Sequence, residues 1–209
     1  MRTIYNRGLV ILMKAREGDC IKTFKKLIFD VKGLVHPSNR IVAFIRYFPC
    51  EKGERKKKGI SYGKVYSLSK RYAWLKENLP EYLIYDPIFD EVLCEVPVED
   101  VEKHYTPVET VRRLLKAESL DSLEFKALEL VSLLRASANI PWNVIGISGS
   151  LMVGLHMPSS DIDLLVYGSE NCRKVYSAIE SLLKDSSCPL KPYSLDELRQ
   201  LFDFRSKDT

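Results

Sequence analysis

Apolar positions in the first half of the chain mostly follow the periodicity of β-strands. Between 27 and 34, apolar residues at every second position (Leu27, Phe29 and Val31) fall on one side, which is typical of a strand with one buried face. The run 40–48 is almost continuously apolar and ends at Pro49, and the turn-forming residues 36–39 separate it from the first run. The pattern therefore predicts a β-hairpin.

One helix is expected within this strand-rich half. Ser67 can cap it, Pro80 stops it, and apolar residues recur between them at helical spacing. A short strand at 64–66 precedes the helix, and another strand is expected near 91–96. These elements predict a small α+β module over residues 1–97.

Residues 98–140 are expected to form a mostly helical connection. Asp121 is a good N-cap for a helix whose buried stripe reaches Leu134 at helical spacing. Asn139 and Pro141 then end that helix.

Apolar runs and turn residues alternate beyond this point, in residues 141–209. The predicted elements are a buried strand at 144–147, a helical turn at 151–155, a strand at 161–167, a helix capped by Ser169 that reaches 184, and a short helix opened by the capping box of Ser194 and Glu197.

Composition places the chain among globular proteins. It has 209 residues, of which 45% are hydrophobic and 29% charged, and this excludes a disordered, collagen-like or coiled-coil chain. No apolar stretch approaches the length of a membrane span. The apolar run 8–13 is too short for a secretory signal and is expected to be a strand or a helical turn. We predict an α+β fold, with a basic N-terminal module followed by a core that contains a small mixed sheet.

The cysteines and histidines give no sign of a metal or disulfide framework. The five cysteines form no C-x-x-C pair, and the three histidines stand alone in the sequence. We therefore predict a cytoplasmic protein whose cysteines are reduced thiols.

The net charge of +4 conceals two different halves. Residues 1–80 hold 19 Lys or Arg against 6 Asp or Glu, whereas residues 81–209 hold 13 against 22. Such a basic half favours contact with nucleic acid or another polyanion. The densest cluster lies between two strand-like runs, where it is either the solvated tip of a hairpin or part of that polyanion surface. Its members are Lys52, Arg55, Lys56, Lys57 and Lys58.

Two features that carry chemistry lie close together in the last third of the chain. Gly149 and Ser150 stand at the end of a strand and the start of a helical turn, where backbone N–H groups are free to meet an anion. Ten residues further on, Asp161 and Asp163 are separated by one residue. In a strand such residues face the same side.

Two carboxylates on one face repel each other unless a cation lies between them. Oxygen ligands of this kind suit Mg²⁺, which usually completes its shell with water and the phosphates of a substrate. The anion-binding turn and the acid pair therefore predict metal-assisted transfer from a nucleoside triphosphate.

The segment 144–168 resembles the signature of the polymerase-beta-like nucleotidyltransferase superfamily. That signature is an apolar strand, Gly-Ser, a spacer of about this length, and Asp-x-Asp on the next strand. The N-terminal segment around 36–47 also resembles uncharacterised archaeal proteins that place such a module before a nucleotidyltransferase domain.

The resemblance implies a role for each residue of the motif. Asp161 and Asp163 would hold Mg²⁺ or Mn²⁺, and Gly149 and Ser150 would bind the triphosphate. The superfamily normally has a third carboxylate on a later strand. Asp203 is the nearest candidate here, but it lies in an expected helix, so the core at 141–209 is either incomplete or degenerate.

The sequence thus supports an enzyme and two alternatives. The enzyme would move a nucleoside monophosphate from an NTP to a hydroxyl or phosphate acceptor, with RNA or DNA held by the basic half as candidate acceptors. The alternatives are a non-catalytic nucleic-acid- or nucleotide-binding protein and an antitoxin-like interaction subunit completed by another chain. Arg173 and Lys174 are either phosphate ligands or part of an exposed helix face.

Overall fold

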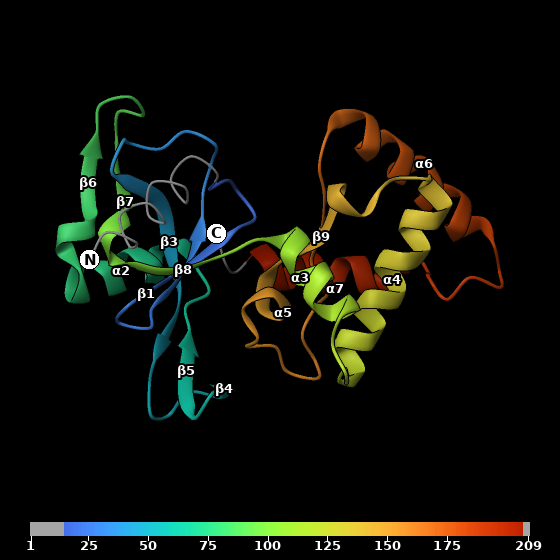
Figure 1. The fold of residues 1–209 in the computed structure, drawn as a ribbon, viewed down its shortest axis with the longest axis horizontal. Helices are drawn as coiled ribbons and strands as arrows, with labels where there is room; N and C mark the ends of the chain where they lie inside the picture. Colours follow the sequence, from blue (N-terminus) through green and yellow to red (C-terminus); the bar gives the residue numbers. More distant parts are fainter. Residues whose placement is uncertain (1–14, 207–209) are drawn as a thin grey trace. The chain divides into compact units, whose positions relative to one another are not determined.

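A computed structural model describes residues 15–206, without the side chains of 204 and 205. The described chain forms two compact units (Figure 1). The first contains the residues up to Thr106 together with Met152–Met157, and the second contains Pro107–Leu151 and the residues from Pro158 onward. The apolar run 8–13 lies outside the described residues.

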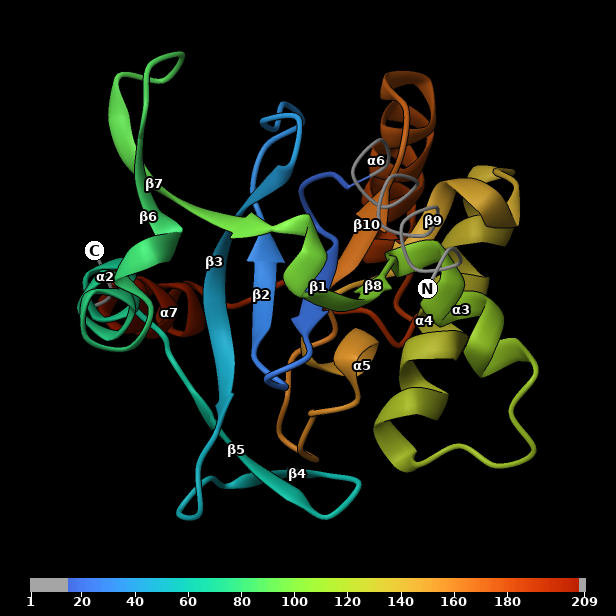
Figure 2. The same cartoon turned by 60° about the vertical axis from the view of Figure 1, so that its left-hand side comes forward.

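The first unit is built on a curled antiparallel sheet, which Figure 2 shows with β3 as its long strand. Among the described residues the order is β4-β5-β3-β2-β1-β8, and β7 pairs with both β3 and β6. The strands are β1 (Cys20–Thr23), β2 (Ile28–Val31), β3 (Arg40–Pro49), β4 (Arg55–Lys57), β5 (Ile60–Lys64), β6 (Leu83–Asp86), β7 (Glu91–Pro97) and β8 (Val101–Tyr105).

The predicted hairpin of β2 and β3 is confirmed, and so is the helix after Ser67. Helix α2 (Leu68–Asn78) begins at this N-cap, whose hydroxyl accepts a hydrogen bond from the backbone N–H of Lys70. Leu75 and Leu79 are buried in one core with side chains of the sheet, such as Phe29 and Ile41. Short 3₁₀ turns at Pro80–Tyr82 and Val98–Asp100 connect the following strands. The α+β class is therefore confirmed.

The boundary between the units falls inside the segment that the sequence analysis assigned to a helical connection. Residues 98–106 were assigned to a helical connection, but Val101–Tyr105 forms β8, which pairs with β1 in a register that sets Tyr105 opposite Cys20. This strand satisfies the free edge of β1, an interaction between residues about eighty positions apart that no local pattern indicates. The first unit therefore ends at Thr106.

The second unit is mainly helical and has a core of its own. Its elements are α3 (Pro107–Leu115), α4 (Ser122–Ala138), a 3₁₀ turn at Trp142–Val144, β9 (Ile145–Ile147), α5 (Gly149–Val153), β10 (Leu164–Val166), α6 (Ser169–Lys184) and α7 (Leu195–Arg205). The last two residues of α5 belong to the first unit.

The helix caps follow the sequence closely. Asp121 and Glu124 form a capping box on α4, and Ser194 and Glu197 form the predicted one on α7. The cap of α6 differs, because Gly168 is its N-cap and Ser169 is its first helical residue.

The sheet of the second unit is smaller than predicted. Among the described residues it consists of β9 and β10 alone, which pair antiparallel, whereas a small mixed sheet was expected. Strand β10 also starts at Leu164, not at Asp161, because β9 ends at Ile147 and offers no further strand residue to pair with. Two paired strands need other elements to bury their face. Helices α3, α4 and α6 supply apolar residues to the core that contains Ile145 and Ile147.

None of the described helices is long and apolar enough to cross a membrane. All five cysteines are free thiols.

Gly146 allows β9 to pack directly against the start of α3. A Cβ atom at this position would lie 2.5 Å from the carbonyl carbon and the Cβ of Pro107. We expect Gly146→Ala to lower the free energy of unfolding by about 1–3 kcal/mol, because an overpacked core must shift its backbone. Denaturant unfolding checks this, with Ser137→Ala on the exposed side of α4 as a control that should change stability little. An unchanged stability for Gly146→Ala would contradict the described packing.

A buried pair of acids lies where β6 meets β7. Glu95 is only 3% exposed, and its side chain is hydrogen-bonded to that of Asp86, which is equally buried. Burial raises the pKa of Glu95, and the neighbouring charge of Asp86 raises it further. The Oδ1 atom of Asp86 already accepts hydrogen bonds from the backbone N–H groups of Ile88 and Phe89, so the shared proton is expected on Glu95.

Because the pKa of Glu95 is raised on folding, its contribution to stability is complete below its ordinary pKa and is lost as the pH rises through the folded value. Glu95→Gln keeps a donor toward Asp86 without a titrating proton. We expect this variant to be more stable than the wild type at pH 8, by about 1 kcal/mol, with a smaller difference at pH 4. Thermal unfolding at both pH values checks this, with exposed Glu91→Gln on the same strand as control. A gain independent of pH would contradict the assignment.

Candidate functional site

Strands β9 and β10 bring the Gly-Ser turn and the acid pair to one end of the same two-stranded sheet. Leu164 lies opposite Ile147, and the backbone N–H of Ser148 donates to the carbonyl oxygen of Asp163 over 2.8 Å, which continues the pairing by one residue. The residues that leave β9 and those that enter β10 are therefore neighbours. Sequence spacing alone did not establish this contact.

Gly149 lies directly against the carboxylate of Asp163. A Cβ atom at Gly149 would lie 2.0 Å from Oδ2 of Asp163, a distance that no real side chain could occupy. Gly149 also has a φ of +63°, in the left-handed region that glycine adopts without a steric penalty. The positive φ favours glycine at this position, and any larger residue would in addition push the exposed carboxylate of Asp163 out of its present place.

The two carboxylates of the motif lie on the solvent side of the chain. Asp161 and Asp163 are exposed, whereas Ile162 and Leu164 pack against the core of the second unit. This alternation is the one predicted for a strand, although β10 itself begins only at Leu164. The extended segment before β10 thus keeps the period of two without a full ladder of hydrogen bonds.

Ser150 has a different environment from its neighbour. It is the second residue of α5 and is only 8% exposed, so in this conformation little of its side chain is accessible.

No strand follows β10 in the described residues, so the later strand expected to carry a third carboxylate is not found there. The residues after β10 form α6, an irregular stretch and α7, and Asp203 lies exposed on α7, as the sequence predicts. Its exposed position on a helix gives no indication that it completes the acid pair.

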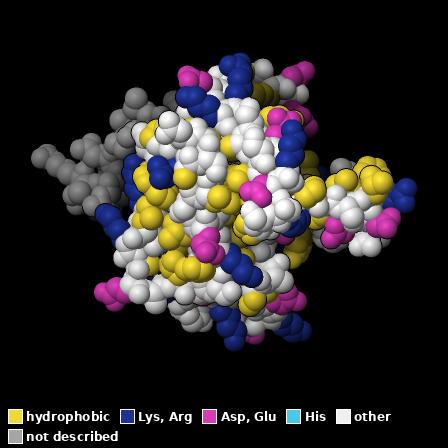
Figure 3. All heavy atoms as spheres, turned by 90° about the vertical axis from the view of Figure 1, so that its right-hand side faces the viewer, with side chains coloured by type: hydrophobic (Ala, Val, Ile, Leu, Met, Phe, Trp, Pro, Cys, Tyr) yellow, Lys and Arg dark blue, Asp and Glu magenta, His cyan; other side chains and the backbone are white. Residues whose placement is uncertain are grey.

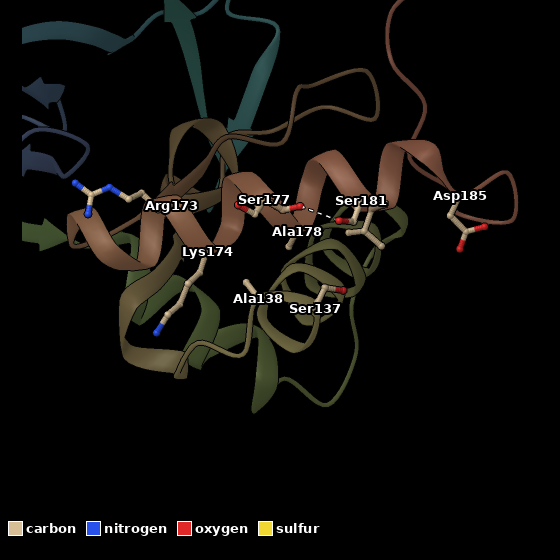
Figure 4. Close-up of a pocket in the computed structure, with 9 residues that line it drawn as sticks. Ser137, Ala138, Arg173, Lys174, Ser177, Ala178, Ser181 and Asp185 are labelled. Atoms are coloured by element: carbon tan, nitrogen blue, oxygen red, sulfur yellow. Dashed lines mark hydrogen bonds between the residues drawn. The ribbon is translucent and has the colours of Figure 1, made fainter.

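Arg173 and Lys174 lie on α6 beside a shallow groove between α4 and α6 (Figure 4). The groove has a volume of about 670 Å³, and the small side chains of Ala138 and Ala178 form its floor. Lys174 makes an ion pair with Glu170, with 2.8 Å between Nζ and Oε1. This pair accounts for the position of Lys174 without a phosphate, which favours the exposed helix face of the two alternatives.

The acidic excess of the second half does not form one continuous patch on the face shown in Figure 3, which looks from the side where α4 and α6 are drawn. Acidic and basic side chains are interspersed there with hydrophobic ones. This face therefore offers no single charged surface to a partner.

The five basic residues of the cluster at 52–58 fall into two groups. Lys52, Lys56 and Lys58 are exposed, as expected of a polyanion surface. Arg55 is buried and Lys57 is half-buried, and both donate hydrogen bonds to backbone carbonyls within the first unit. Arg55 and Lys57 are therefore not part of the exposed basic surface, because strand β4 turns alternate side chains to opposite faces.

Comparison with known proteins gives a relative but no function. The uncharacterized protein MJ1086 of Methanocaldococcus jannaschii is 32% identical to this chain over 204 residues. The alignment covers 94% of this chain but 59% of the relative, so the chain spans a little more than half of that protein. No model of a protein family matches the sequence, and no solved structure matches the chain.

The contact between Gly149 and Asp163 can be tested by a double-mutant cycle. We expect Gly149→Ala to lower the free energy of unfolding by about 1–3 kcal/mol, since it adds backbone strain and displaces the carboxylate of Asp163. In a chain that also carries Asp163→Ala, only the strain should remain.

Gly59→Ala is the matched control for strain, because Gly59 has a φ of +80° but no atom within 4 Å of the added Cβ. Its effect should equal the part of Gly149→Ala that persists in the double variant. Effects of Gly149→Ala and Asp163→Ala that simply add would contradict the contact.

Proposed function

We propose that this chain is a metal-dependent nucleotidyltransferase. It would move a nucleoside monophosphate from an NTP to a hydroxyl or phosphate acceptor and release pyrophosphate. The observation that carries the proposal is the close approach of Gly149 to the carboxylate of Asp163, which joins an anion-binding turn and an acid pair in one place. Neither feature alone would distinguish this chemistry from ordinary turn and surface residues.

The donor set fits Mg²⁺ or Mn²⁺. Asp161 and Asp163 are both exposed, and their ligand atoms are carboxylate oxygens, which suit these cations. Because glycine has no Cβ, the carboxylate of Asp163 can lie directly beside the backbone of Gly149. A bound divalent cation would supply positive charge for the phosphates and for the charge that develops during transfer.

The remaining contributions come from the chain itself. The backbone of Gly149 and Ser150 would bind the phosphates through N–H groups, because the first residues of a helical turn have no partner within the helix. The rigid pairing of Ser148 with Asp163 would hold this backbone and the carboxylates at a fixed separation.

The acceptor is proposed to be RNA or DNA, held by the exposed lysines of the first unit. Lys52 lies in the turn between β3 and β4, Lys56 lies on β4, and Lys58 lies in the turn between β4 and β5. Contacts of this kind bind phosphates through counterion release and do not select a sequence. A cytoplasmic setting is part of the proposal and agrees with five free thiols.

One observation favours a second candidate. After β10 the described residues contain no strand that could carry a third carboxylate, so the site is suited to binding a nucleotide even if it lacks the group that activates the acceptor. In that case the chain would be a nucleotide- or nucleic-acid-binding protein, or a subunit completed by a partner.

Metal-dependent nucleotide binding tests the proposal. The melting temperature of the wild type is measured with each NTP, with and without Mg²⁺. An NTP that binds the folded state raises this temperature, because at a hundred times its Kd it stabilises that state by about 2.7 kcal/mol. At least one NTP should do so, and the effect should require the metal. The Asp161→Asn, Asp163→Asn double variant should not respond.

The matched control removes two acidic charges elsewhere in the same unit. Glu129→Gln with Glu180→Gln changes exposed residues of α4 and α6 and should respond like the wild type. Equal responses from both double variants, or a response without metal, would contradict the proposed site. Transfer of labelled nucleotide to RNA or DNA then separates the enzyme from the binding protein.

A further inference from the structure

The loop that connects the Gly-Ser turn with the acid pair is fixed within the first unit. Its first part, Met152–Met157, belongs to that unit. Met152, Val153 and Leu155 are buried there, in a cluster rich in tyrosine. The other buried members of the cluster are Cys20, Ile28, Tyr47, Tyr62 and Tyr105.

Lys57 holds the end of α5. Its ammonium group donates a hydrogen bond to the carbonyl oxygen of Val153, the last residue of that helix. A cation is favourable at this position, because the last carbonyls of a helix have no partner within it. The helix stops at Gly154, whose φ of +65° is typical of a C-terminal cap, and the Nζ atom of Lys57 lies beside it.

Lys57 is itself held in place from the other side. Its Nζ atom lies 3.3 Å from the hydroxyl of Tyr105 and 5.0 Å from the centre of that ring. Burial raises the pKa of Tyr105 to about 12, so the phenol is neutral at physiological pH. The ring face and the carbonyl together surround the ammonium group, which fixes a side chain that would otherwise be flexible.

Arg55 makes the equivalent contact two residues further along the loop. Its guanidinium donates to the carbonyl oxygen of Leu155 and lies 5.7 Å from the ring centre of Tyr47. Arg55 is only 7% exposed. A charge at this depth is tolerated only when its hydrogen bonds are made.

The two cations share one face of β4, and Lys56 between them is exposed on the other. Strand geometry thus assigns alternate residues of one basic cluster to different tasks. Lys56 remains available to a ligand, whereas Arg55 and Lys57 are committed to the loop.

We infer that Arg55 and Lys57 are positioning residues for the candidate nucleotide site. They hold Val153 and Leu155, and so restrict the ten-residue segment that separates Ser150 from Asp161. This role rests on the proposed function, since the segment it restricts joins the two halves of that site. It also means that part of the basic cluster serves the nucleotide site and not the acceptor.

The test replaces the charge of Lys57 while keeping its length. We expect Lys57→Met to raise the hydrogen-exchange rates of the amides in residues 152–157 by about tenfold or more, as expected for a lost charge-assisted hydrogen bond. We also expect it to raise the Kd for the Mg²⁺ complex of the NTP that binds the wild type by about tenfold. Lys57→Arg keeps a donor and should restore both values.

Lys56→Met is the matched control, because it removes the same charge from the same strand on the exposed face. It should leave loop exchange and NTP affinity as in the wild type. Arg55→Lys and Arg55→Met repeat the comparison at Leu155. If Arg55→Met does not fold, the Lys57 variants still test the positioning role, because Lys57 is only half-buried and its replacement disturbs the core less.

Failures of the two ideas are distinguishable. If the wild type binds no NTP with Mg²⁺, the proposed function is wrong. The hydrogen-exchange rates of residues 152–157 then test by themselves whether Arg55 and Lys57 hold the loop. If the wild type binds and Lys57→Met binds equally well, the positioning role is overturned and the function stands. Equal exchange in Lys57→Met and Lys56→Met would also overturn it.

Discussion

The candidate site depends on the contact between a glycine that has no side chain and an aspartate carboxylate that fills the space. Any Cβ at Gly149 would collide with Oδ2 of Asp163, and the backbone of Gly149 takes a conformation that other residues rarely adopt. The hydrogen bond from Ser148 to Asp163 fixes the two segments in this relation. The turn and the acids consequently form one local structure, although ten residues separate Ser150 from Asp161.

The intervening loop connects this local structure with the basic half of the chain. Buried apolar side chains anchor residues 152–157 in the first unit, and two cations of β4 bind backbone carbonyls there. Net charge alone would assign Arg55 and Lys57 to a polyanion surface. Burial and hydrogen bonding assign them to the loop instead, and leave Lys56 on the exposed face of β4. Because side chains alternate along a strand, β4 places Arg55 and Lys57 on the face toward the loop and Lys56 on the exposed face.

Local signals carried the sequence predictions that succeeded. Caps and stops such as Ser67 and the box of Ser194 with Glu197 act within a few residues, so the sequence alone locates these helices. The α+β class and the inward and outward alternation at 161–164 were predictable for the same reason. The pairing of β8 with β1, the acceptors of Arg55 and Lys57, and the collision space at Gly149 join residues far apart in sequence or depend on atomic distances. No periodicity encodes them.

The most direct test of the central claim locates a cation in a crystal of this chain. Crystals grown with Mn²⁺ and a non-hydrolysable NTP analogue would give an anomalous signal at each manganese. The account predicts a peak within about 2.2 Å of carboxylate oxygens of both Asp161 and Asp163, with the phosphates of the analogue against the backbone of Gly149 and Ser150. A well-occupied manganese and nucleotide elsewhere, with both carboxylates uncoordinated, would contradict it.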